Sequence, residues 1–229
     1  MNLLRLKPRE KPEPLLMEIE TRRVALVTPM EEVCPVEFHN SMVRMVAQTM
    51  MVMPHLHLMP LHFGCSVLPL ARQLLALRAL EHGATHLLWI DSDMDFPGDA
   101  LIRLMRHNEA IVGVNYLSKR PPYALTARNA EGEMITRQES TGLEKARSLG
   151  FGLVLIAADV FRKLTLPWFQ FEWEERTSTF IGEDFYFCKK AIAAGFQPMV
   201  DQSLSREIHH VGTFKYSTLL KSMGEPDFL

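Results

Sequence analysis

Short apolar runs alternate with amphipathic stretches along most of the chain. Residues 24–28 (VALVT) and 86–90 (HLLWI) are nearly continuous apolar runs, as is typical of strands that are buried on both faces. Residues 37–50 and 67–81 instead place apolar side chains three and four positions apart, which predicts helices with one face toward a core. Strands that alternate with helices in this way predict an α/β fold.

The other expected elements follow from the same patterns. The predicted strands are residues 24–28, 55–63, 86–90, 110–116, 149–157 and 197–200, and the predicted helices are residues 37–50, 67–81, 99–107 and 182–194. In the second helix, Leu70, Leu74 and Leu77 share the face that we expect to be buried. Residues 123–137 alternate in polarity and contain the turn-like sequence NAEG, which favours a hairpin and therefore a mixed sheet.

The composition fits one globular domain, because 229 residues with 47% hydrophobic and 23% charged content can bury a sizeable core. Residues 1–21 alternate charge with proline and predict a flexible N-terminal arm, which leaves residues 22–229 as a single domain. The apolar pieces of the arm are too short for a secretion signal, and no transmembrane segment is expected.

Charge and cysteine content narrow the possible partners and compartment. With 25 basic and 27 acidic residues the net charge is −2, so bulk electrostatic binding of nucleic acid is not expected. Cys34, Cys65 and Cys188 lie far apart and match neither a disulfide framework nor a zinc motif, which favours a reducing cytoplasm. Nothing in the composition indicates an oligomeric state.

Three acidic residues follow directly after the strand at residues 86–90, namely Asp91, Asp93 and Asp95. Ligands of open α/β sheets bind at the carboxyl ends of the strands, so this is where chemistry is expected. Residues i and i+2 of an extended segment point the same way, so Asp91 and Asp93 can offer oxygens to one Mg²⁺ or Mn²⁺ ion. The plainer interpretation is an acidic turn that caps the following helix.

Three known motifs contain a comparable D-S-D-M-D sequence. A calcium loop requires glycine and glutamate where this chain has Phe96 and Ile102, which excludes that site. A phosphotransferase with Asp91 as nucleophile would have threonine or valine in place of Asp95 and would carry the motif after its first strand, so both features count against it. The third motif is the DxD of glycosyltransferases that use nucleotide sugars.

Residues 84–104 resemble the DxD region of GT-A glycosyltransferases, in particular family 2-like members. Other segments are similar to this family in the same order, namely Gly150-Phe151-Gly152, Gly182-Glu183-Asp184 and His210-Val211-Gly212. The resemblance covers residues 22–216 and rests on the ordered set of motifs. It implies a Rossmann-like α/β/α sandwich with a mixed central sheet, and a hexosyltransferase that takes its sugar from a nucleotide donor, with UDP or GDP as the expected nucleotide.

The resemblance also implies a metal site. Asp93 would bind the ion directly, Asp91 would reach it through water or the donor ribose, and His210 would complete the protein ligands. An imidazole ligand favours Mn²⁺ over Mg²⁺. A bound cation would stabilise the negative charge of the departing diphosphate.

Glu183 and Asp184 begin the predicted helix at residues 182–194, where a helix dipole favours negative charge. Capping alone could explain both acids. By resemblance, Asp184 is the base that removes the acceptor proton in an inverting transfer, and Glu183 orients or binds the acceptor.

Three further residues are candidates for donor binding by resemblance. Thr28 and Pro29 end the first strand, where the nucleotide of a GT-A donor would lie. Arg72 matches an arginine that faces the donor, and it could pair with phosphate or orient Asp91.

The acceptor is unknown and could be a glycan, a lipid-linked sugar, a protein or a nucleic acid. Candidates for contact with it are Gly152, Glu183 and Trp168, the last because an aromatic ring can stack on a sugar. The insert at residues 123–149 is the expected place for acceptor choice. Two alternatives stay open, namely a Mg²⁺-dependent phosphotransferase or phosphatase that uses Asp91, and a scaffold of the same fold that binds a nucleotide or glycan without catalysis.

Overall fold

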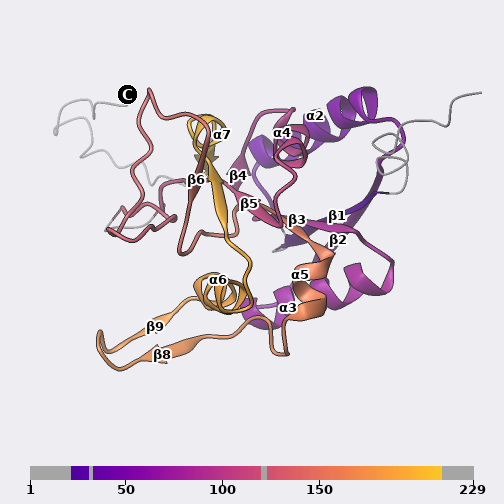
Figure 1. The fold of residues 1–229 in the computed structure, drawn as a ribbon. Helices are drawn as coiled ribbons and strands as arrows, with labels where there is room; N and C mark the ends of the chain where they lie inside the picture. The colour runs from indigo at the N-terminus through magenta and orange to yellow at the C-terminus, as the bar shows by residue number, and fades with distance from the viewer. Residues whose placement is uncertain (1–21, 31–32, 120–122, 213–229) are drawn as a thin grey trace, which may run out of the picture.

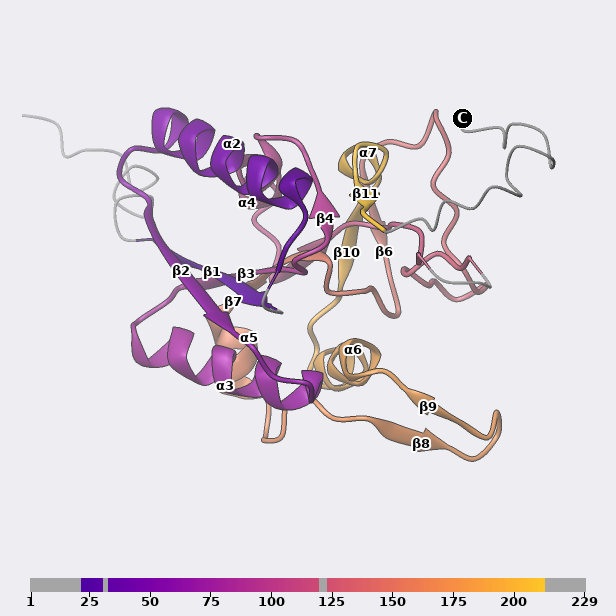
Figure 2. The same cartoon turned by 180° about the vertical axis from the view of Figure 1, so that it is seen from behind.

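The computed structural model describes residues 22–30, 33–119 and 123–212, and the predicted arm at residues 1–21 lies outside these ranges. In the described part, a seven-stranded mixed sheet has the order β2-β1-β3-β7-β5-β10-β6 and carries helices on both faces (Figure 1). The view from behind shows the same three layers (Figure 2). The predicted α/β sandwich with a mixed central sheet is thereby confirmed.

The element bounds are close to those expected in the first half of the chain. The main sheet contains β1 (Arg23–Pro29), β2 (His57–Phe63), β3 (His86–Ile90), β5 (Ile111–Gly113), β6 (Leu143–Lys145), β7 (Leu153–Ala157) and β10 (Met199–Asp201). Two small ribbons pair β4 (Met94–Asp95) with β11 (His209–His210) and β8 (Glu172–Glu174) with β9 (Thr179–Ile181). The helices are α2 (Val36–Val52), α3 (Leu68–Glu81), α4 (Ala100–Arg106), α5 (Ala158–Lys163), α6 (Glu183–Ala193) and α7 (Gln202–Ser205).

The central strands are apolar throughout because both of their faces are covered. Ala25, Val27 and Trp89 face a core cluster that includes residues of α3, α5 and α6. Leu26 and Leu88 face the opposite cluster, with residues of α2, α4 and α7. The alternation along each strand therefore separates two cores, and it explains why no polar face marks β1 or β3 in the sequence.

Strand β7 runs antiparallel to both of its neighbours, β3 and β5. Its start therefore lies beside the carboxyl ends of those strands, with Ile90 paired to Leu153. The backbone N–H of Asp91 donates to the carbonyl of Gly152 across 3.0 Å. This reversal brings Gly152, which precedes a strand, to the same edge as Asp91, which follows one.

Two sequence-based expectations need correction. In α3 the buried face contains Ala71, Leu75, Ala76 and Ala79, whereas Leu70 and Leu77 are exposed, so the predicted face was displaced by one position. Small alanine side chains allow the helix to pack closely on the sheet, and a leucine count misses them. In residues 123–137 the chain does reverse at the NAEG turn, with an antiparallel bridge between Arg128 and Glu133, but this pairing is an isolated bridge and not the predicted pair of strands.

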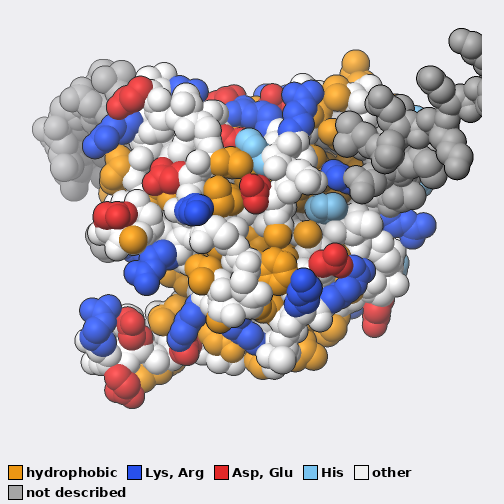
Figure 3. All heavy atoms as spheres, viewed as in Figure 1, with side chains coloured by type: hydrophobic (Ala, Val, Ile, Leu, Met, Phe, Trp, Pro, Cys, Tyr) orange, Lys and Arg blue, Asp and Glu red, His pale blue; other side chains and the backbone are white. Residues whose placement is uncertain are grey.

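Two further observations concern the charged side chains on the surface and the length of the helices. On the face shown in Figure 3, acidic and basic side chains are interspersed over the described residues. None of the helices in the described ranges combines the length and the apolar character needed to cross a membrane.

Candidate functional site

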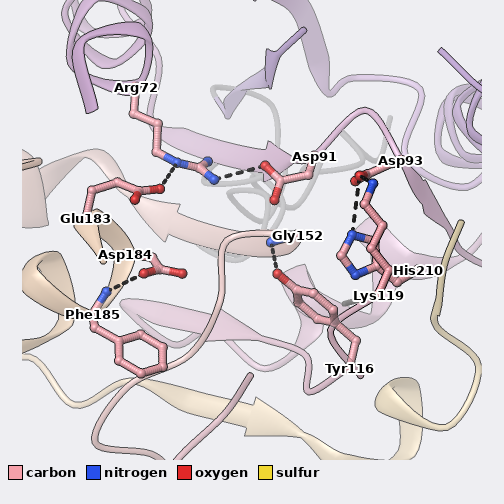
Figure 4. A network of polar contacts seen from close by, with 10 residues as sticks. All are labelled: Arg72, Asp91, Asp93, Tyr116, Lys119, Gly152, Glu183, Asp184, Phe185 and His210. Carbon is pink, nitrogen blue, oxygen red and sulfur yellow. Dashed lines mark hydrogen bonds and ion pairs between the residues drawn. The ribbon is translucent and has the colours of Figure 1, made fainter. Parts of the chain in front are cut away.

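Arg72 joins two of the predicted acids at the carboxyl end of the sheet (Figure 4). It lies on α3 with a side chain that is 2% exposed. Its Nη2 donates to Oδ1 of Asp91 across 2.9 Å, and its Nε donates to Oε1 of Glu183, also across 2.9 Å. One guanidinium thus fixes the end of β3 to the start of α6.

Aromatic rings enclose this guanidinium. The Cζ atom of Arg72 lies 5.6 Å from the ring centroid of Trp89 and 5.3 Å from that of Phe151. Burial alone would lower the pKa of Arg72, but the nearby carboxylates outweigh it and raise the pKa above its ordinary value. The side chain therefore stays charged. Its Nη1 is buried without a hydrogen-bond partner in the described part of the chain.

Asp184 stands beside this pair at the start of α6 and is half-buried. Its Oδ1 accepts a hydrogen bond from the backbone N–H of Phe185 across 2.8 Å. Burial and the neighbouring charge of Glu183 raise the pKa of Asp184 to about 7. A carboxyl group with this pKa can both accept and release a proton near neutrality.

The side chain of Asp91 is 28% exposed and its charge is partly desolvated. Burial raises the pKa of its carboxyl group, and the attraction of Arg72 opposes that change only in part. Its backbone is fixed to Gly152 as described above. The backbone of Asp91 is therefore held by Gly152, and its carboxyl group is held by Arg72.

The second half of the site is built by the β4–β11 ribbon. Val211 N–H donates to the carbonyl of Asp93 across 2.7 Å, and His210 pairs with Met94 in the ribbon. Together these contacts place Nε2 of His210 3.3 Å from Oδ2 of Asp93. Residues from distant parts of the sequence thus meet beside β3.

The tautomer of His210 follows from its other ring nitrogen. Nδ1 lies 3.1 Å from the carbonyl oxygen of Leu117, which only accepts, so Nδ1 carries a proton. Nε2 then faces the carboxylate of Asp93 either as an N–H of the imidazolium or as a lone pair that shares a cation with it. The hydrogen bond to Asp93 raises the pKa of His210, consistent with the first state.

Lys119 also contacts Oδ2 of Asp93 through its ammonium group. Burial alone would raise the pKa of Asp93, but the hydrogen bonds from His210 and Lys119 outweigh it and lower the pKa to about 2. Asp93 is therefore ionised across the physiological range, with an ammonium group and an imidazole ring on one oxygen.

The predicted metal set is only partly assembled. The structure brings Asp93 and His210 together, but Arg72 holds the carboxylate of Asp91 elsewhere (Figure 4). Across residues 22–30, 33–119 and 123–212, no three His, Cys, Asp or Glu side chains converge closely enough to hold a metal ion. The protein therefore offers two donors, and a divalent cation there would need water or ligand oxygens for the rest of its shell.

Tyr116 is a site residue that the sequence analysis missed. Its hydroxyl oxygen accepts a hydrogen bond from the backbone N–H of Gly152, and its ring packs edge-on against His210 with centroids 5.5 Å apart. Burial and the charges of Asp91 and Asp184 raise its pKa well above the ordinary value. Tyr116 thus contacts Gly152 on one side of the site and His210 on the other. The signal in the sequence that could have identified it is its position at the end of the strand expected at residues 110–116.

The donor candidates at the first strand occupy the same edge of the sheet. Thr28 is buried and Pro29 is half-buried at the end of β1, which pairs in parallel with β3. The structure therefore places both residues one strand away from Asp91.

The acceptor candidates are corrected in two places. Trp168 is buried, donates from Nε1 to the carbonyl of Leu164 across 3.1 Å, and packs against Phe161, so it presents no stacking surface. Glu183 is buried and paired with Arg72, which counts against contact with the acceptor, while the orienting role expected for it stays a prediction. Gly152 does line the site, through its backbone.

Exposed aromatic residues lie instead on the β8–β9 hairpin. Trp173 and Phe180 are 47% and 65% exposed, and their ring centroids are 5.1 Å apart. The hairpin projects from the body next to α6 (Figures 1 and 2).

Comparison with known proteins supports the fold alone. The sequence matches no protein-family model. A search of curated proteins also found no matching sequence. The fold is similar to a solved structure described as A197 from STIV, with a TM-score of 0.51 and 13% identity over 86% of this chain and 99% of that one. An apo UDP-glucose pyrophosphorylase gives a TM-score of 0.40 and 9% identity over 82% of this chain and 75% of that one, which is too distant to bear on function.

Proposed function

We propose that the protein is a glycosyltransferase that moves a sugar from a nucleotide donor, UDP- or GDP-linked, to an acceptor hydroxyl. The observation that carries this proposal is the meeting of Asp93 with His210 beside the Arg72–Asp91 ion pair. A carboxylate and an imidazole that face each other suit a divalent cation, and the buried arginine fixes the acid next to them.

The residues present fit a divalent cation. Asp93 and His210 would hold it, and the hydrogen bond from Nδ1 to Leu117 orients the imidazole as in many metal sites. A histidine ligand favours Mn²⁺, and Mg²⁺ is the alternative. When bound, the cation supplies positive charge to the diphosphate that leaves the sugar.

Asp184 is the proposed base. As the acceptor oxygen bonds to the anomeric carbon, the bond from that carbon to the diphosphate oxygen breaks, and the Asp184 carboxylate takes the hydroxyl proton. Its pKa of about 7 matches this task, because a base is most effective when its pKa lies near the working pH. Attack from the side opposite the leaving group inverts the anomeric centre.

Arg72 and Glu183 are positioning residues in this proposal. Because Arg72 binds Asp91 and Glu183 together, it sets the separation between the end of β3 and the start of α6, where Asp184 stands. The same pairing disfavours the phosphotransferase alternative, since a carboxylate engaged by a buried guanidinium is a poor nucleophile.

Calorimetric titration of UDP, GDP, ADP and CDP tests the proposal, first with Mn²⁺ and then with EDTA. We expect one diphosphate to bind only with the metal, and to lose that binding in Asp93→Ala but not in the exposed control Asp159→Ala. In Asp184→Asn the same diphosphate should still bind while transfer to acceptors is lost. If none of the four binds under any condition, the proposal is wrong.

A further inference from the structure

The ammonium group of Lys119 contacts the carboxylate of Asp93, which a shared cation would also use. Nζ of Lys119 and Nε2 of His210 contact the same atom, Oδ2 of Asp93. A divalent ion held between Asp93 and His210 would stand beside this ammonium, and two positive centres at such close range repel strongly. The cation and the Lys119–Asp93 ion pair are therefore mutually exclusive.

The surroundings of Lys119 show that its placement belongs to the site. Leu117, two residues earlier, supplies the carbonyl that fixes the imidazole of His210. The side chain of Lys119 also runs past Gly212, where an added Cβ would lie 3.8 Å from both Cβ and Cδ of the lysine. One segment thus supports the histidine and carries the competing charge.

We propose that Lys119 makes cation binding depend on the nucleotide. In the protein without ligand, its ammonium neutralises Asp93 and opposes the entry of the cation. When a nucleoside diphosphate binds, its phosphate oxygens receive the displaced ammonium, and the cation takes its place on Asp93. This inference rests on the proposed function, because it requires a diphosphate in the site.

The chemistry of lysine suits this exchange. Its charge stands on a four-carbon stem with rotatable bonds, and ammonium groups are common phosphate ligands. If the ammonium group of Lys119 moved into water, it would lose its ion pair with Asp93 and gain no other. If it moved to a diphosphate, it would form a new ion pair. Cation and nucleotide therefore each favour the binding of the other, and the two effects must be equal by linkage.

The test is the affinity for Mn²⁺ alone and with the diphosphate that binds best, measured by electron paramagnetic resonance of the free ion. Lys119→Met keeps the length of the stem and removes the charge, and Lys119→Arg keeps the charge. The control is Lys145→Met, at an exposed position of strand β6. We expect Lys119→Met to bind Mn²⁺ about 10-fold more tightly than wild type without nucleotide. The further tightening by the diphosphate should be smaller in this variant than in wild type, Lys119→Arg or Lys145→Met.

Two outcomes separate this inference from the proposed function. If the diphosphate binds with Mn²⁺ but Lys119→Met has the affinity of wild type for Mn²⁺ alone, the role of Lys119 is wrong and the proposed function stands. If wild type binds Mn²⁺ and no diphosphate, the proposed function fails and the coupling with it.

Discussion

The hydroxyl oxygen of Tyr116 lies 3.0 Å from the backbone nitrogen of Gly152, and the phenol ring covers the position that a side chain at 152 would occupy. A Cβ at Gly152 would come within 2.6 Å of Cζ of Tyr116. The glycine and the tyrosine are therefore fitted to each other at the point where β7 begins.

This fit predicts that Gly152→Ala lowers the free energy of unfolding by about 1–3 kcal/mol, because the ring has to shift in a packed site. In a Tyr116→Ala background the same change should cost less, since the clash is gone. Urea denaturation of the two single variants and the double variant measures the difference. Additive effects would show that the two residues do not interact in this way.

Arg72→Met should destabilise the protein by about 3–5 kcal/mol, because it leaves the buried Glu183 and the half-buried Asp91 without their shared partner. Arg78→Met, on the exposed side of the same helix, is the matched control and should cost about 1 kcal/mol or less. Equal losses in the two variants, again measured with urea, would contradict the assigned role of Arg72.

Asp184→Asn should be more thermally stable than wild type at pH 8. The pKa of Asp184 in the folded protein, about 7, lies above its ordinary value of 3.8, so the folded state binds more protons than the unfolded state between these values. Wild-type stability attributable to this group therefore falls as the pH rises from about 4 to 7. Asparagine keeps the acceptor for Phe185 N–H and removes the charge.

Differential scanning calorimetry of wild type and Asp184→Asn at pH 5 and pH 8 measures this difference in stability. We expect a gain in Tm of several degrees at pH 8 that narrows at pH 5. Asp159→Asn, at an exposed position, should show no such dependence on pH. A gain that is the same at both pH values would rule out the raised pKa as its cause.

The rate of sugar transfer should rise with pH through about 7, because the base acts only when its carboxyl group is ionised. The measurement is kcat/KM from pH 5.5 to 8.5 at a saturating concentration of Mn²⁺. A profile without an ascending limb near pH 7 would assign the proton transfer to another group.

Trp168 and Trp173 should respond differently to truncation. Trp168→Ala removes a buried ring and should cost about 3–5 kcal/mol of unfolding free energy. Trp173→Ala removes a half-exposed ring from the β8–β9 hairpin and should cost about 1 kcal/mol or less. Thermal denaturation of both variants compares them directly, and a similar loss would show that the hairpin ring is part of the core.

The sequence predicted the sheet-and-helix order well where one pattern was strong. Continuous apolar runs identified β1, β3 and β7, because strands covered on both faces carry little else. It failed in the segment between β5 and β7 and at the β8–β9 hairpin, where the strands are three residues long or absent. Strands this short are stabilised by partners far away in the sequence, which the local hydrophobic period does not reveal.

The sequence predicted most of the residues of the site, but not the contacts between them. Asp91, Asp93, Glu183 and Asp184 do lie near one another, as their positions after a strand or at a helix start indicated, and His210, which was expected only from the resemblance, lies beside Asp93. The sequence could not show that Arg72 is buried, because an arginine inside a helix pattern is usually solvated. Tyr116 was missed for a similar reason, since it acquires its role only through contacts with Gly152 and His210, which lie far along the chain.

The side chains around Arg72 and those around Lys119 differ in how much conformational freedom they would lose when a ligand binds. On one side the buried Arg72 is paired with Asp91 and Glu183, so these carboxylates are already ordered before a ligand binds. Around Lys119 a long side chain, 35% exposed, has to be rearranged and fixed before the ligand is bound. For the proposed nucleotide ligand we therefore expect most of the side-chain entropy lost on binding to fall on the side of Asp93, where affinity should depend most on temperature and salt.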